Sequence, residues 1–132
     1  RLRSRGLGDV YKRQILYRGD IVKIQENLKR GMTELLILHL LKEDDMYGYQ
    51  LTQELEKRSE GLFILKEGTM YPSLYRLIDK GMISDRKELI GKRRVRVYYH
   101  IEQAGIEYLD AIYGEYLSIT EGIHKILNYT GE

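Results

Sequence analysis

Apolar residues in the first half of the chain recur every three or four positions, which is the spacing of one face of an α-helix. From about Asp20 to Lys42 they form one stripe, interrupted only by Gly31. A second, shorter stripe lies in residues 47–61, YGYQLTQELEKRSEG, and ends at the stop signal Gly61. The stretch KEDDMYGY breaks the period between them, so the pattern predicts two helices joined by a turn.

Residues 66–83, KEGTMYPSLYRLIDKGMI, predict a third helix, although they hold the only proline of the chain. Thr69 is placed to cap the start of this helix, and Gly81 is placed to close its end. Pro72 then falls near the third helical position, where the N–H that proline lacks has no partner inside the helix. One face is apolar and is expected to face a core: Met70, Leu74, Leu77 and Ile78.

After the third helix the period changes to two. Residues 94–101, RVRVYYHI, alternate apolar with basic or polar side chains, which is the pattern of a half-buried strand. Residues 83–89, ISDRKEL, are the expected partner strand, and residues 90–94, IGKRR, are the expected turn. The segment therefore predicts a β-hairpin with a strongly basic tip.

The last segment, EQAGIEYLDAIYGEYLSITEGIHKILNY, predicts one long helix. Its apolar residues are alternately three and four apart, as in a heptad seam: Leu109, Ile112, Tyr116, Ile119, Ile123 and Ile126. Such a seam exceeds what one small domain needs for its own core. We therefore expect a homodimer interface, with packing inside the protomer as the alternative.

The predicted order is helix, helix, helix, hairpin, long helix. It defines a mainly α fold with a small β-hairpin: a winged helix-turn-helix domain over residues 20–101 and a C-terminal dimerisation helix over residues 102–132. Residues 1–19 are rich in Arg and Gly and have no clear period. We interpret them as a non-native or disordered extension and exclude them from the fold.

Composition and charge narrow the class of protein. The chain has no cysteine, no apolar run of the ~18 residues that a membrane span needs, and no signal peptide, so we expect a soluble cytoplasmic protein without a membrane partner. The net charge is only +2, but residues 66–100 carry nine Lys/Arg against four Asp/Glu. Residues 101–132 carry one against six. Such blocks predict a basic surface that faces a polyanion.

Catalytic and metal-binding patterns are weak in this sequence. The three histidines, His39, His100 and His124, lie on different predicted elements, which argues against a metal site. No nucleophile–base pair or carboxylate dyad has supporting context, and GKRR lacks the rest of a phosphate-binding loop. We therefore expect no enzyme activity, no cofactor and no metal.

Four stretches resemble the PadR family of transcriptional regulators: RGMTELLILHLL, YGYQLTQELE, EGTMYPSLYRLIDKGMI and RRVRVYYHIEQAGIEYL. The resemblance covers roughly residues 24–130 and implies a dimeric repressor that binds a double-stranded DNA operator and is released by a small effector. Two features depart from the family: Glu102 stands where Thr is usual, and the chain has no tryptophan to hold a flat aromatic drug. A small aromatic effector would instead meet the tyrosines of the last helix: Tyr108, Tyr113 and Tyr116.

The third helix is the expected recognition helix, whose N-terminal half enters the major groove. Small and polar residues there permit close approach, and hydroxyls can donate to phosphates. Its expected DNA contacts are Thr69, Tyr71, Pro72, Ser73, Tyr75 and Arg76. The hairpin is the expected wing, which reaches the neighbouring minor groove or backbone. Its expected contacts are Lys92, Arg93, Arg94 and Arg96, and Tyr47 of the second helix completes the set.

Several alternatives stay open from the sequence. Tyr71 and Tyr75 could be packing tyrosines with a hydrated hydroxyl. The basic turn could be an ordinary solvated hairpin tip. The whole domain could be a protein-interaction module, or a scaffold for a small molecule without a direct role on DNA.

Overall fold

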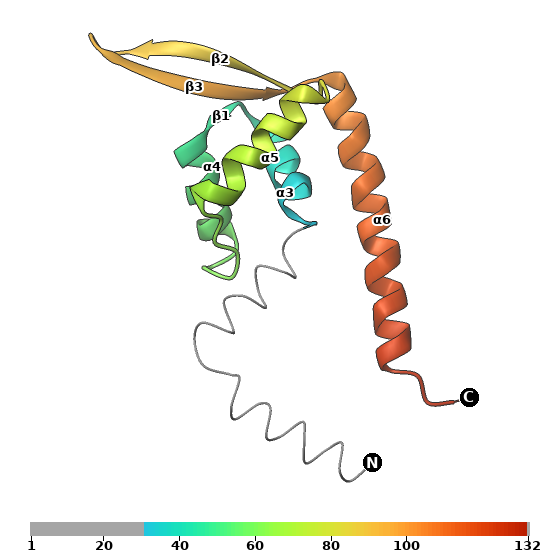
Figure 1. Ribbon diagram of the computed structural model, residues 1–132. Coiled ribbons are helices and arrows are strands. Elements are labelled where there is room, and N and C mark those ends of the chain that lie inside the picture. Colours follow the sequence, from blue (N-terminus) through green and yellow to red (C-terminus); the bar gives the residue numbers. More distant parts are fainter. Residues whose placement is uncertain (1–30, 132) are drawn as a thin grey trace. The chain divides into compact units, whose positions relative to one another are not determined.

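Residues 31–131 are the part of the chain that the structure, a computed structural model, describes (Figure 1). They form four helices and three strands in the order α3 (Thr33–Glu43), β1 (Met46–Tyr47), α4 (Gly48–Arg58), α5 (Glu67–Asp79), β2 (Ile83–Ile90), β3 (Arg94–Ile101) and α6 (Gln103–Leu127). This order confirms the predicted winged helix-turn-helix with a long final helix. The interpretation of residues 1–19, and the first half of the helix predicted from Asp20, concern residues outside the described ones.

α3 is the central helix of the domain. It begins at Thr33, after a turn at Gly31 and Met32, and it packs against α5, α6 and β3. Four of its side chains are almost completely buried: Ile37, Leu38, Leu40 and Leu41. A helix that is apolar on most of its circumference has to be covered on several sides, so the other elements assemble around it.

β2 and β3 form the predicted hairpin. They pair in antiparallel register from Ile83↔Ile101 at the base to Ile90↔Arg94 at the tip. Gly91 opens the connecting turn with a φ of +66°, a conformation that costs glycine little. The strand and turn boundaries therefore agree with the sequence prediction to within a residue.

The sequence does not predict β1, which occupies the stretch interpreted as a break between two helices. Met46 pairs with Tyr99 and Tyr47 pairs with Tyr98, so β1 lies on the free edge of β3 and the sheet order is β1-β3-β2. A strand of two residues is too short to show a period of two. It forms because β3 offers unpaired backbone groups there.

Only the base of the hairpin packs against the helices. Ile83, Tyr99 and Ile101 are buried, whereas Leu89 and Val95, near the tip, are 68% and 59% exposed. Figure 1 shows the tip extending beyond α4 and α5. The expectation of a half-buried strand is thus correct only for the second half of β3, because the two strands extend past the helices that could cover them.

α5 begins earlier than the sequence predicts. Its first residue is Glu67, and Lys66, not Thr69, is the N-cap, without a side-chain cap. The carbonyl oxygen of Lys66 accepts hydrogen bonds from the amides of Thr69 and Met70, which adds one turn to the helix. Pro72 is therefore the sixth helical residue, not the third. Pro72 has no N–H to donate to the carbonyl of Gly68, four residues earlier, and solvent can reach that carbonyl because Gly68 is exposed.

Two glycines let the chain turn from α5 into β2 and from β3 into α6. Gly81 closes α5, as predicted, with a φ of +72°, and the amide of Met82 then donates to the carbonyl of Leu77. Gly105, in the first turn of α6, lies so close to Met82 that an added Cβ would be 2.2 Å from its carbonyl oxygen. The start of α6 is thereby fixed against the start of β2.

α6 confirms the predicted long helix. Only its first turns are covered, where Gly105 and Leu109 are buried against the rest of the domain and α6 packs on α3. The remainder of the helix extends past α3 (Figure 1). Most of the predicted heptad seam therefore lies on the uncovered part.

Candidate nucleic-acid interface

The predicted DNA contacts of α5 separate into exposed and enclosed side chains. Thr69, Pro72, Tyr75 and Arg76 are exposed on the helix, and the Tyr75 side chain is 58% exposed. Met70, Leu74 and Leu77 are buried, as the apolar pattern predicts. α5 thus presents a small hydroxyl, a proline ring, a phenol and a guanidinium to solvent.

Tyr71 and Tyr75 form a stacked pair, with ring centroids 6.2 Å apart. Tyr71 is half-buried and packs over the start of α4, where a Cβ added to Gly48 would lie 2.7 Å from its hydroxyl oxygen. Burial raises the pKa of the neighbouring Tyr99 to about 12, and the hydroxyls of Tyr71 and Tyr75 add to the shift. The packing alternative thus applies to Tyr71, and Tyr75 offers the more accessible hydroxyl.

Ser73 lies in the interior of the protein. It is 1% exposed. Its hydroxyl donates to the carbonyl oxygen of Thr69 at 3.1 Å and accepts from the Arg76 guanidinium at 3.0 Å. The position predicted to touch DNA therefore places this side chain behind the helix surface, where it orients Arg76.

Arg76 is also held by α3. Its Nε lies 3.6 Å from a carboxylate oxygen of Glu34, and the other oxygen of Glu34 accepts a hydrogen bond from the Tyr108 hydroxyl at 3.3 Å. Burial, together with the Glu34 carboxylate, raises the pKa of Tyr108, so this phenol stays protonated as a donor. Glu34 thus joins a residue of the expected recognition helix to a tyrosine of α6.

The wing tip carries three exposed basic residues in a row, Lys92, Arg93 and Arg94. Among residues 31–131, no ion pair or side-chain hydrogen bond engages any of the three. Because no nearby carboxylate of the described residues compensates these three positive charges, each of them can attract an anion without first losing a partner. This is the property that the sequence predicted for the wing.

Arg96, further down β3, is held differently. Its guanidinium lies over the ring of Tyr47 at 4.2 Å and makes a hydrogen bond with the Tyr98 hydroxyl, which raises the pKa of Arg96. Tyr47 meets Tyr98 edge-on at 5.5 Å, and the guanidinium of Arg86 lies 5.3 Å from the Tyr98 ring centroid. We call these four side chains the Arg–Tyr stack. The structure thus brings the predicted residues Tyr47 and Arg96 together, at the base of the wing.

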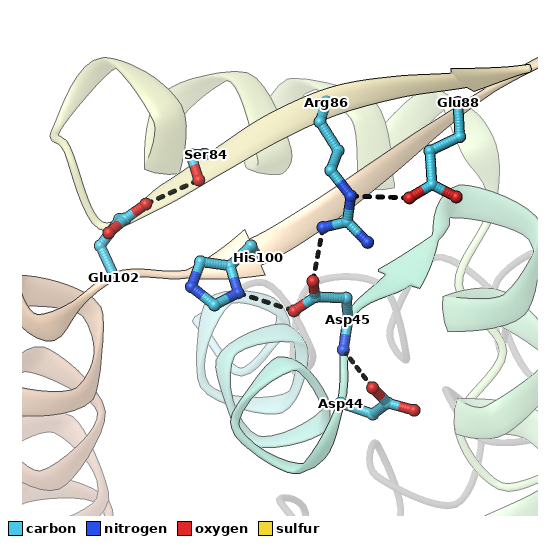
Figure 2. Close-up of polar contacts among 7 residues, drawn as sticks. All are labelled: Asp44, Asp45, Ser84, Arg86, Glu88, His100 and Glu102. Carbon is cyan, nitrogen blue, oxygen red and sulfur yellow. Dashed lines mark hydrogen bonds and ion pairs between the residues drawn. The ribbon is translucent and has the colours of Figure 1, made fainter.

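Sequence reasoning missed a carboxylate that contacts Arg86, one member of this stack (Figure 2). Asp45, between α3 and β1, pairs with Arg86 of β2 and makes a 2.7 Å hydrogen bond with Nδ1 of His100 on β3. Burial works to raise the pKa of Asp45, but the hydrogen bonds with His100 and Arg86 outweigh burial and lower it. Nε of Arg86 also donates to Glu88 at 2.9 Å. The only signal in the sequence was an acidic pair before an unrecognised strand.

The predicted dimer seam is buried only where α6 meets α3. Leu109 is buried and Ile112 is half-buried. Tyr116, Ile119, Ile123 and Ile126 are between 38% and 76% exposed. The ring of Tyr113 stacks on Tyr116, with centroids 6.5 Å apart. Packing inside the protomer therefore accounts for the first position of the seam and leaves the later ones uncovered.

The described residues show neither a metal site nor a membrane span. No three His, Cys, Asp or Glu side chains of residues 31–131 come together to hold a metal ion. None of the helices in this part of the chain is both long and apolar enough to cross a bilayer.

Comparison with known proteins identifies the fold. The family described as "Transcriptional regulator PadR-like family" matches residues 37–111. The chain is 32% identical over 98 residues to the uncharacterised protein X of Lysinibacillus sphaericus, covering 74% of this chain and 90% of that protein. These matches confirm the resemblance to the PadR family that the sequence indicated. They also agree with the expectation that the chain is a transcriptional regulator and not an enzyme.

Solved structures give the same result. A PadR family transcriptional regulator from Eggerthella lenta superposes with a TM-score of 0.74 at 26% identity, over 85% of this chain and 96% of that chain. Bacillus subtilis PadR in complex with operator DNA superposes with a TM-score of 0.55 at 26% identity. That match covers 59% of this chain and 44% of the Bacillus protein, so this chain spans less than half of that relative.

Proposed function

The chain belongs to the PadR-like family of transcriptional regulators, and from this premise we propose that it binds a specific DNA operator as a homodimer. The observation that carries the proposal is the wing tip, where Lys92, Arg93 and Arg94 are exposed and unpaired among the described residues. Neutralising DNA phosphates with such charges releases counterions, which drives association. The operator complex of Bacillus subtilis PadR, a protein of similar fold, supports DNA as the polyanion.

α5 is the proposed recognition helix. Among its exposed residues, Thr69, Pro72 and Tyr75 are the proposed direct contacts, with the Tyr71 hydroxyl at their edge and Arg76 beside them. Ser73 has a supporting role, since its buried hydroxyl holds Arg76. The wing tip contacts the adjacent backbone, and Arg96 with Tyr47 supports the wing from its base.

The uncovered part of α6 is the proposed dimer interface. Tyr116, Ile119, Ile123 and Ile126 follow heptad spacing and are exposed in the single chain. Contiguous apolar side chains on a soluble protein are typical of an association surface. A dimer would present two recognition helices to the two halves of a palindromic operator.

We propose repression, with release by a small effector, as the mode of regulation. An aromatic effector would meet the tyrosines of α6, of which Tyr113 and Tyr116 form an exposed stacked pair. Binding there would change the relative position of the two DNA-binding domains, which shifts the population between two dimer geometries.

The test is selection of bound duplexes from a random pool, followed by a salt titration of the selected sequence. We expect a palindromic sequence whose half-sites are about one helical turn apart, and a steep loss of affinity as salt rises. No measurable binding at low salt would overturn the proposal and would favour the protein-interaction module. Arg93→Ala with Arg94→Ala should weaken DNA binding and leave any effector binding unchanged; equal loss of both would argue against separate sites.

A further inference from the structure

A carboxylate of the α3–β1 connection is one of the contacts that link the base of the wing to the helical core. Asp45, Arg86 and His100, here called the Asp45 cluster, come from three elements: the α3–β1 connection, β2 and β3 (Figure 2). Figure 2 shows the Asp45 side chain directed toward the two wing strands. Arg86 and His100 belong to the hairpin, whereas Asp45 does not, so the cluster is a contact between the hairpin and the rest of the domain.

The strand register explains why this contact reaches both wing strands. Arg86 is opposite Tyr98, and His100 is opposite Ser84, so Arg86 and His100 share one face of the hairpin on neighbouring strands. β1 pairs only with β3 in the sheet order. The backbone next to Asp45 therefore holds β3, and the Asp45 side chain reaches past β3 to hold β2 as well.

The cluster lies opposite the apolar contact of the wing. Ile83, Tyr99 and Ile101 are buried on the core-facing side of the hairpin base. Arg86 and His100 occupy the other side, together with the Arg–Tyr stack. A two-stranded hairpin has little stability of its own in water, and the outer half of this one has exposed side chains on both faces. Its direction is therefore set by contacts at the base, one set on each face.

We propose that Asp45 is a positioning residue for DNA binding: by holding Arg86 and His100 it fixes the direction of the wing so that Lys92, Arg93 and Arg94 reach the DNA backbone. The inference rests on the proposed function of the wing. Asp45 itself touches no DNA in this scheme and acts through the hairpin.

For Asp45→Asn, the proposal and long-range electrostatics predict opposite changes in operator affinity. Asp45 is an acidic residue at the base of a basic wing, and Asp45→Asn makes the chain one unit more positive. Long-range attraction alone then predicts tighter binding to any duplex. Loss of wing position predicts weaker binding to the operator, because the tip charges no longer meet their phosphates.

A matched control lies one residue before Arg86. Asp85 is exposed on β2, and no ion pair or side-chain hydrogen bond engages it among the described residues. Asp85→Asn makes the same change in net charge, on the opposite face of the same strand, without touching the Asp45 cluster. The difference between the two variants therefore isolates the contact from the charge.

The experiment measures fluorescence anisotropy of two labelled duplexes, one selected from a random pool by the wild-type chain and one random duplex of equal length, over a range of salt. We expect Asp45→Asn to bind the selected duplex on the order of tenfold more weakly, with a shallower salt dependence because wing phosphates are lost. We expect Asp85→Asn to bind it as well as, or better than, wild type. In a chain that already carries Arg93→Ala and Arg94→Ala, Asp45→Asn should have less than about a twofold effect, since coupled residues are not additive.

Three results would overturn the proposal. The first is that Asp45→Asn binds the selected duplex as tightly as Asp85→Asn does. The second is that Asp45→Asn lowers the affinity by the same factor whether or not Arg93 and Arg94 are present. The third is that the affinity falls while its salt dependence stays unchanged, which is also what a smaller folded fraction would produce. Arg86→Lys serves if Asp45→Asn does not fold: it keeps the charge but loses the planar fork, so unchanged binding also counts against the proposal. If wild type and Asp85→Asn bind neither duplex, the proposed function itself has failed.

Discussion

The exposed seam of α6 leads to a quantitative prediction about dimer stability. Ile119 is 59% exposed in the single chain. Complete burial of an isoleucine side chain stabilises by about 1.5–3 kcal/mol, so covering this exposed part contributes about 1–2 kcal/mol per protomer. Because a two-fold interface buries the residue twice, Ile119→Ala should weaken dimerisation by roughly 2–4 kcal/mol, which is a factor of roughly 30 to 700 in the dimer Kd.

Sedimentation velocity over a range of protein concentrations measures this Kd, and circular dichroism checks that helix content is unchanged. Leu62→Ala is the matched control, since Leu62 is 80% exposed but lies between α4 and α5, off the seam. It should leave the dimer Kd unchanged. A wild-type chain that stays monomeric at tens of micromolar would refute the reasoning from the heptad pattern, as would an Ile119→Ala dimer as tight as wild type.

Three further predictions concern backbone and charge. Gly105→Ala places a Cβ 2.2 Å from the Met82 carbonyl oxygen, and since backbone cannot move aside easily, we expect a net loss of about 1–3 kcal/mol in urea unfolding despite the better helix propensity of alanine. Gly48→Ala meets only the far ends of the Tyr71 and Met70 side chains, so its urea midpoint should fall less than that of Gly105→Ala while operator affinity falls several-fold; the reverse ranking of the two variants would contradict this prediction. The pKa of Asp45 is lowered in the folded state, so its stabilising contribution is present above the ordinary carboxyl pKa and is lost as pH falls through the lowered value. The difference in unfolding free energy between wild type and Asp45→Asn should therefore disappear in acid, and a difference that persists below pH 2 to 3 would show that the carboxylate charge is not its source.

Periodicity predicted the parts of the fold in which one face is buried over many residues. The 3.6 period of α5 and the period of two in β3 are long enough to identify both elements and their buried faces. The predicted start of α5 was wrong, because a side-chain cap at Thr69 was expected, whereas the N-cap is Lys66, which makes no side-chain cap. A helix can begin without a side-chain cap, so a residue of a capping type does not by itself fix the first helical residue, and the position of Pro72 was misjudged with it.

The candidate site was harder to predict, because its members depend on contacts between distant segments. Ser73 is polar and lies next to an exposed proline, yet it is buried, since it is on the side of α5 that packs against the core. Asp45 gave no signal beyond its place in an acidic pair, because its partners are 41 and 55 residues away and β1, which carries it to the sheet, has only two residues. The residue pattern around Asp45 cannot predict partners that come close to it only because of the way the strands pair.

Charge counting alone overstates how much of the basic block is available to DNA. Arg76 is held by Glu34 and Ser73, Arg86 by Asp45 and Glu88, and Arg96 by two tyrosines. A guanidinium beside a carboxylate has part of its charge compensated locally, so it adds less to the long-range attraction for a phosphate than an unpaired one. The tip residues Lys92, Arg93 and Arg94 have no such carboxylate beside them among the described residues. In the proposed mode of binding, the arginines of this block therefore divide into two groups: the paired Arg76, Arg86 and Arg96 would fix the direction of α5 and the wing, and the unpaired tip would supply the attraction for DNA.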